Sequence, residues 1–211
     1  MRIFFALAAI SIAAGCSRTE SNETSRPGDT TVAPPASVQP AAQSTDTIPT
    51  AALDCGVKGK PVLTGEGIGD LRKGRKVTEV KAMCPIESDS NQPGPEGSTE
   101  RVLVVPLGPE TVRAVVNDDR VFRIIVSSPY FRTEDSLGVD TPLHKLASMR
   151  GAQFFPGEDG VYGFVADHCG ISFRFSVPMR PPKGGQWNVA SINKAHGDAA
   201  VDRVLLTGCS R

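Results

Sequence analysis

One pattern of apolar residues occurs twice along the chain, and it constrains the fold more than any other feature. The segments 71–83 (LRKGRKVTEVKAM) and 137–149 (LGVDTPLHKLASM) align without a gap. The apolar residues that then coincide are Leu71, Val77, Val80 and Met83 with Leu137, Leu143, Leu146 and Met149. Apolar residues three positions apart lie on one face of a helix, so each segment is predicted to be helical.

Each predicted helix is followed by three short runs in which apolar and polar residues alternate, as they do in half-buried strands. The runs are 101–107, 111–117 and 120–128 after the first helix, and 160–166, 170–176 and 201–208 after the second. We therefore predict an α+β domain of two helix-plus-three-strand antiparallel repeats, about 65–128 and 133–209, with the helices packed on a sheet.

Residues 1–15 predict export from the cytoplasm. Arg2 is their only charged residue, and the apolar run 3–14 is shorter than the roughly 20 residues of a membrane-spanning helix. A positive start followed by a short apolar run is typical of a signal peptide. The sequence AAGC at 13–16 resembles the lipobox of bacterial lipoproteins, which implies cleavage before Cys16 and attachment of lipid to that cysteine.

The lipobox resemblance also implies a location. Ser17, where Asp would favour retention at the inner membrane, implies a lipid anchor in the periplasmic face of the outer membrane of a Gram-negative cell. The alternative is an ordinary signal peptide and a secreted or periplasmic soluble protein.

Residues 16–50 are rich in Ser, Thr, Pro and Ala and contain almost no large apolar side chain. Such a segment cannot bury enough apolar surface to fold, so we predict a disordered tether. The globular domain is then 51–211. The chain has 23 Lys and Arg residues against 23 Asp and Glu residues, and this neutrality argues against nucleic acid as a partner.

The four remaining cysteines of an exported chain predict two disulfides, for which three pairings are possible. Cys169 begins one predicted strand and Cys209 ends another, so the two meet if those strands are antiparallel neighbours. Cys84 ends the first predicted helix and Cys55 lies on the segment leading into it. We therefore favour the pairs Cys55–Cys84 and Cys169–Cys209.

No segment carries a complete catalytic or cofactor motif. The glycine-rich stretch 64–76 has Arg75-Lys76 where a phosphate-binding loop needs Lys followed by Ser or Thr. The three histidines, His144, His168 and His196, lack the spacing of a zinc site. Cys169 stands beside His168, but it has a plausible disulfide partner. We expect no catalytic residue, no metal and no cofactor.

Arginines form the candidate binding face. A three-residue turn at 117–119 would place Arg113 opposite Arg123, and Arg174 and Arg203 stand at the matching places of the second repeat. Alternation puts these side chains on the sheet face opposite Ile171, Phe173 and Phe175, where they would suit an acidic partner. Alternatively, they lie on a solvated face and cover apolar neighbours such as Val115 and Ile125.

The stretch KGRKVTEVKAMC (73–84) resembles the helix start of a family of small bacterial envelope proteins. The family includes the small accessory lipoprotein of the outer-membrane barrel-assembly machinery and the tandem-repeat β-lactamase inhibitory proteins. Gly74, Thr78, Glu79 and Val80 match in character, but Asp140 replaces the glycine in the second copy. The resemblance implies helices on an antiparallel sheet and a role in binding other proteins. It assigns no contact residues, because the matching motif is structural.

The leading hypothesis is a non-catalytic protein-binding or scaffold role in the cell envelope, with an envelope protein as partner. The alternative is a binding module for an anionic small molecule or glycan, in which the arginines bind the ligand and Trp187 forms a lid. A third hypothesis is a hydrolase whose acid and base come from distant segments. The alternative for Trp187 is that its side chain fills the edge of the hydrophobic core.

Overall fold

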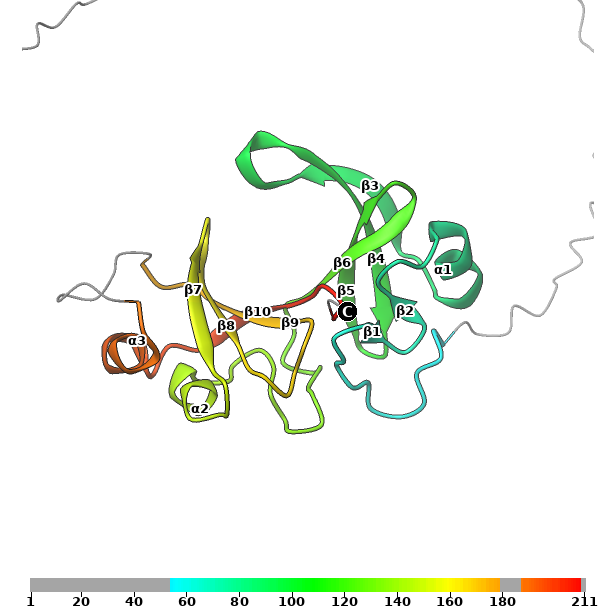
Figure 1. Ribbon diagram of the computed structural model, residues 1–211. Helices are drawn as coiled ribbons and strands as arrows, with labels where there is room; N and C mark the ends of the chain where they lie inside the picture. Colours follow the sequence, from blue (N-terminus) through cyan, green and yellow to red (C-terminus); the bar gives the residue numbers. More distant parts are fainter. Residues whose placement is uncertain (1–53, 179–186, 210–211) are drawn as a thin grey trace, which may run out of the picture. The chain divides into compact units, whose positions relative to one another are not determined.

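The computed structural model describes residues 54–178 and 187–209. The predicted signal peptide, Cys16 and the tether 16–50 lie outside the described residues. Eight strands form one antiparallel sheet, and two short ones, β1 (Gly67–Ile68) and β2 (Leu71–Arg72), form a separate hairpin (Figure 1).

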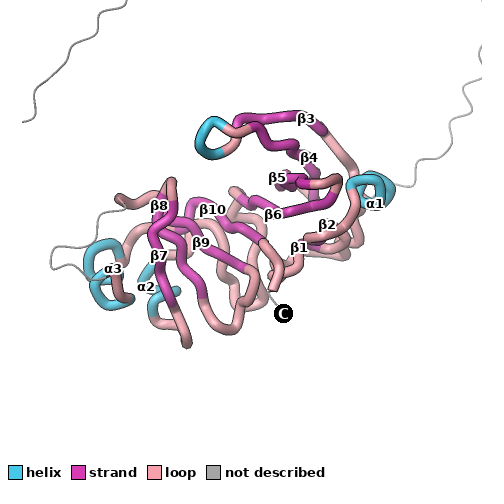
Figure 2. The backbone as a smooth tube through the Cα atoms, turned by 45° about the horizontal axis from the view of Figure 1, so that its top comes forward, coloured by secondary structure: helices cyan, strands magenta, loops and turns pink. Residues whose placement is uncertain are grey.

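The large sheet consists of two four-stranded halves that meet at β6 and β10 (Figure 2). The first half contains β3 (Ser88–Pro93), β4 (Thr99–Leu107), β5 (Glu110–Asn117) and β6 (Arg120–Val126). The second contains β7 (Gln153–Gly157), β8 (Gly160–Phe164), β9 (Ile171–Phe175) and β10 (Val201–Leu206). The spatial order is β3-β4-β5-β6-β10-β9-β8-β7, so both halves are antiparallel meanders with β3 and β7 at the edges.

The described helices are short. They are α1 (Val77–Met83), α2 (Leu143–Ala147) and α3 (Val189–His196), with a 3₁₀ turn, η1 (Pro95–Gly97), between β3 and β4. The predicted α+β class is therefore wrong, because the described domain is mostly β. Each half also contains a fourth strand that the predicted helix-plus-three-strand unit lacks. That the two halves are repeats of one unit stays a prediction.

Both predicted helices were too long because turns precede them. Leu71 belongs to β2, and Gly74 has a φ of 79°, so the helical backbone begins only at Val77. In the second segment Asp140 has a φ of 67° and α2 begins at Leu143, directly after Pro142. The apolar spacing continued into these turns because their side chains also face the core.

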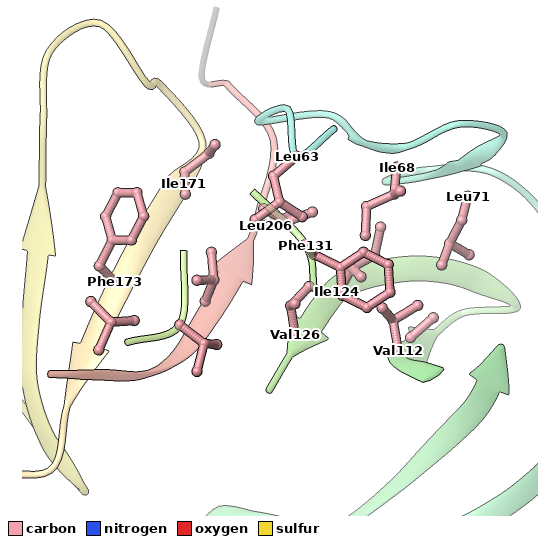
Figure 3. Packing of buried hydrophobic residues seen from close by; sticks show 14 of the residues in the cluster. Leu63, Ile68, Leu71, Val112, Ile124, Val126, Phe131, Ile171, Phe173 and Leu206 are labelled. Carbon is pink, nitrogen blue, oxygen red and sulfur yellow. The ribbon is translucent and has the colours of Figure 1, made fainter. Parts of the chain in front are cut away.

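One continuous core covers a single face of the sheet. Val80 of α1, Leu146 of α2 and Ile192 of α3 are fully buried against it. In Figure 3, Ile68 and Leu71 of the β1–β2 hairpin lie close to Ile124 and Val112 of the sheet. Figure 3 also shows Phe173 and Leu206 of the second half, which belong to the same cluster.

The structure contains the disulfides Cys55–Cys84 and Cys169–Cys209, which is the pairing favoured from the sequence. Cys84 is the C-cap residue that directly follows α1. Because β9 and β10 are antiparallel neighbours, Cys169 and Cys209 come within 5.2 Å of each other between Cα atoms. The second disulfide therefore ties the entry to β9 to the exit from β10.

The segment between β9 and β10 contains α3, which the sequence analysis did not predict. The Asn188 side chain accepts a hydrogen bond from the Ser191 backbone N–H at 2.8 Å and begins the helix. Trp187 packs against the core instead of forming a lid over the arginines. In the part of the chain that the structure describes, no helix is both long and apolar enough to cross a membrane.

Candidate functional site

The β5–β6 turn has two residues rather than the predicted three. Asp118 and Asp119 have φ values of 48° and 56°, the left-handed conformation that a tight two-residue hairpin requires. With this turn and a register shift between Val115 and Val116, Arg113 lies opposite Ile125 and not opposite Arg123. The prediction that these two arginines face each other is wrong.

All four predicted arginines nevertheless project from the same face of the sheet. Arg203 lies directly opposite Arg174, and Leu205 directly opposite Ile125, whose other neighbour is Arg113. Residues opposite each other, or two apart on one strand, share a face. The alternate residues of β9, such as Phe173, are buried in the core, so the arginines project from the opposite face.

A pocket of about 950 Å³ opens on this face where the two halves of the sheet meet, and we call it the midline groove. Its residues from β5, β6 and β10 are Arg113, Arg123, Ile125, Arg203 and Leu205. On one side it is lined by the β3–β4 hairpin, whose tip reaches toward β8 in Figures 1 and 2. On the other side it is lined by Tyr162 and the β7–β8 turn. The remaining lining residues are Pro93, Gly94, Pro95, Glu96, Glu100, Glu158 and Asp159.

A small apolar cluster lies on the arginine-bearing face. Val102, Val115 and Ile125 are buried there, and Leu205 packs against them. Val115 lies directly opposite Arg123, and Ile125 directly opposite Arg113. The arginines therefore stand beside the apolar neighbours that the sequence analysis named, so apolar contact and charge are combined at one site.

In the first half, the arginines hold the β3–β4 hairpin. The Arg123 guanidinium forms a salt bridge with Glu100 at 2.7 Å, and both side chains are mostly buried. Arg113 donates to the Gln92 Oε1 atom at 2.6 Å. Among the described residues, Arg113 makes no salt bridge with a carboxylate.

In the second half, Arg174 and Arg203 share Asp159. The Arg174 Nε atom lies 2.9 Å from Asp159 Oδ2, and the Arg203 guanidinium lies 3.5 Å from the same oxygen. Arg174 also donates to Asp202 and to the backbone oxygen of Asp159. Its side chain is only 11% exposed, so these acceptors replace water around a buried charge.

Asp159 also accepts a hydrogen bond from the Tyr162 hydroxyl at 2.6 Å. Burial alone would raise the pKa of Asp159, but the Tyr162 hydrogen bond and the charges of Arg174 and Arg203 hold it below its usual value. Burial, with the hydrogen bond to Asp159 and its negative charge, raises the pKa of Tyr162 to about 12. Tyr162 therefore stays a neutral donor at physiological pH.

Sequence reasoning missed the acidic partners Glu100, Asp159 and Asp202. Asp159 lies in the Glu-Asp turn between Gly157 and Gly160, a recognisable hairpin signal. A hairpin needs a strand on each side of its turn. No strand was predicted before this turn, because β7 was missed.

Both edge strands of the sheet contain a proline. Pro93 ends β3 and Pro156 lies within β7. Proline has no N–H to offer a further strand, and edge prolines commonly protect sheets against unwanted pairing. The edges are thus poor templates for adding a partner strand, whereas the arginine-bearing face is open at the midline groove.

Cys169 and the adjacent His168 do not form a thiol site, since Cys169 is bonded to Cys209. The His168 Nε2 atom lies 3.1 Å from an Asp135 carboxylate oxygen. Within 54–178 and 187–209, no group of three or more His, Cys, Asp or Glu residues is arranged to hold a metal ion.

No family model matches the chain, and no curated protein matches it. Among solved structures, the uncharacterized protein YfeY from Escherichia coli aligns over 71% of this chain and 99% of its own chain. The identity is 16% and the TM-score is 0.46, so nothing is carried over from it.

Proposed function

We propose that this chain is a non-catalytic protein-binding lipoprotein of the bacterial cell envelope, which holds a polypeptide segment of a partner in the midline groove. The single observation that carries the proposal is the lining of the groove. Ile125 and Leu205 provide apolar contact, while arginines and carboxylates stand around them as donors and acceptors. A polypeptide segment offers the matching mixture of apolar, acidic and basic groups.

The charges of the groove favour a polypeptide over a small anion. Its lining contains three arginines and four carboxylates, so it is not a concentrated positive site. Arg123 and Arg203 already contact Glu100 and Asp159, and an anion would have to compete with those carboxylates. The anionic small molecule or glycan therefore remains the second candidate.

The proposed location rests on the signal sequence and on the disulfides. Two disulfides suit the oxidising environment outside the cytoplasm. With lipid on Cys16, the tether 16–50 would hold the domain near the periplasmic face of the outer membrane. Cys16→Ala tests the anchor, since it should move the protein from the membrane fraction to the soluble fraction. Retention in the membrane fraction would contradict a lipid anchor at this residue.

In-cell photocrosslinking tests the binding function. A photoreactive amino acid replaces Leu205 in the groove or, as a control, the exposed Lys145 of α2 in the full-length protein. We expect a defined adduct from position 205 only, identified by mass spectrometry. Arg113→Glu should abolish that adduct, because it places a negative charge in the groove.

Arg150→Glu is the matched charge control, since the Arg150 side chain is 83% exposed and does not line the groove. It should leave the position 205 adduct intact. The proposal fails if position 205 gives no more adduct than position 145, or if Arg113→Glu and Arg150→Glu have equal effects.

A further inference from the structure

We infer that the partner segment crosses the strands of the sheet, with a carboxylate at Arg113 and an apolar side chain at Phe164. This inference rests on the proposed function and adds the chemistry and direction of the occupant. It comes from one row of side chains that spans both halves of the sheet.

The row follows from the strand register. Arg113 of β5 lies opposite Ile125 of β6, and Ile125 lies opposite Leu205 of β10. Leu205 in turn lies opposite Ser172 of β9. Gly163 of β8 pairs with Phe173 as the last pair of this ladder, and the same register extended by one residue brings Phe164 to the position of Ser172. Five adjacent strands thus place an arginine, two aliphatic residues, a serine and a phenylalanine in line.

Arg113 is the cationic end of the row. Its guanidinium contacts the neutral Gln92 amide, whereas Arg123 and Arg174 are held by carboxylates. A carboxylate of the partner can therefore bind Arg113 without displacing a carboxylate of the chain itself. Charge complementarity makes Arg113 the natural site for an acidic group.

Phe164 is the apolar end of the row. Its side chain is 40% exposed and packs edge-on against Phe155, which is 51% exposed, with 5.8 Å between ring centroids. Phe155 lies directly opposite Tyr162, which lines the midline groove. The aromatic surface is thus continuous with the groove, and its exposure leaves room for an apolar anchor.

The row also sets the spacing of the two anchors. Neighbouring strands lie about 4.8 Å apart, so Arg113 and Phe164 are separated by about 19 Å across the sheet. An extended chain covers about 3.3–3.6 Å per residue, so the acidic and apolar side chains should stand about five or six residues apart. Between the two anchors such a segment passes over Leu205, which is partly exposed, because Ile125 and Ser172 are themselves buried.

Selection of peptides from a random displayed library, with the full-length protein as target, tests this arrangement. Binding peptides should contain Asp or Glu and an aromatic or large aliphatic residue at that spacing. Synthetic peptides with two, five or nine residues between the anchors then give affinities by fluorescence anisotropy. We expect the middle spacing to bind at least about tenfold more tightly, the loss on breaking one charged contact.

Two variants test whether Arg113 and Phe164 bind the two anchors of the segment. Arg113→Gln and Phe164→Ala should each weaken binding of the best peptide about tenfold or more. The matched controls are Arg150→Gln and Phe122→Ala, because these side chains are also exposed but do not belong to the row. They should leave the affinity unchanged. Equal thermal midpoints of all variants would show that differences arise from binding.

The outcomes separate the inference from the proposed function. Peptides that compete with one another and lose affinity in Leu205→Ser, yet show no dependence on Arg113 or on spacing, overturn the inference alone. Selected peptides that are indifferent to Leu205→Ser, Arg113→Gln and Phe164→Ala overturn both. The inference stands if affinity depends on Arg113, Phe164 and the spacing between the two anchors.

Discussion

Arg174 of β9 stands directly opposite Arg203 of β10, and the Asp159 carboxylate contacts both guanidinium groups. Like charges opposite each other on neighbouring strands destabilise a sheet unless a counter-charge is close. Asp159 supplies that charge from the β7–β8 turn, so one carboxylate joins three adjacent strands of the second half.

Replacing Asp159 should therefore destabilise the fold although the residue lies in a turn. Asp159→Asn removes the charge but keeps the shape, and leaves Arg174 with less compensation in a mostly buried position. We expect a loss of about 1–3 kcal/mol in the free energy of unfolding. Urea denaturation measures it. The adjacent Glu158→Gln is the control and should change stability by less than about 0.5 kcal/mol. Equal effects would contradict the role of Asp159.

The Tyr162 hydroxyl should lose its proton at a higher pH than an ordinary tyrosine. Its pKa is raised to about 12, so the folded protein holds the phenolic proton at a pH where the unfolded chain releases it. The stability that this difference contributes is complete below about pH 10 and is lost as the pH rises toward the folded value. Ultraviolet absorbance of tyrosinate in a Tyr130→Phe background, which leaves Tyr162 as the remaining tyrosine, follows this titration.

The same titration tests the cause of the shift. Asp159→Asn should lower the Tyr162 pKa toward the usual value, because the negative charge that opposes ionisation is gone. An unchanged pKa would mean that Asp159 does not influence this hydroxyl.

Asp89 should make the first half of the domain sensitive to acid. Hydrogen bonds from Arg101 at 2.7 and 2.8 Å, and the Lys81 amine at 2.7 Å, hold the pKa of Asp89 well below its usual value. A lowered folded pKa contributes stability above about pH 4 that is lost as the pH falls through the folded value. We expect Asp89→Asn to cost about 1–2 kcal/mol at neutral pH.

The Asp89→Asn difference should shrink as the pH falls, because a protonated Asp89 resembles asparagine. Denaturation of wild type and variant across the acid range measures this convergence. A difference that stays constant with pH would contradict a role for the Asp89 charge.

The sequence predicted those parts of the fold that alternate clearly. The runs 101–107, 111–117 and 120–128 correspond to β4, β5 and β6, because Val, Ile and Leu alternate with polar residues there. Neither edge strand was predicted, for a different reason in each case. β3, with the sequence SDSNQP, offers no large apolar residue, and β7 contains Pro156 within a run of five residues.

The candidate site was predicted in part. Alternation alone placed the arginines on one face, because a strand has only two faces. The register between Arg113 and Arg123 depended on the length of the β5–β6 turn and on the register shift beside Val115, and composition determines neither of them. The midline groove depends on the meeting of β6 and β10, whose residues are far apart in the sequence.

Two phenylalanines on opposite faces of the sheet test the assignment of the core. Phe173 is completely buried, whereas Phe155 is 51% exposed. Phe173→Ala should cost about 3–5 kcal/mol in the free energy of unfolding, because it leaves a cavity. Phe155→Ala should change it by less than about 0.5 kcal/mol. Chemical denaturation compares them, and similar losses would place Phe155 in a packed environment instead.

Pro156 should keep the sheet from pairing with another copy at β7. Pro156→Val restores a backbone N–H and adds a β-branched residue beside Phe155, which completes an apolar edge. We expect this variant to self-associate at concentrations where the wild type stays monodisperse, as sedimentation velocity would measure. Pro156→Lys is the matched control, since it restores the same N–H but adds a charge that opposes edge pairing. The role of Pro156 is contradicted if the valine variant sediments like the wild type, and a lysine variant that associates equally would assign the protection to the missing N–H alone.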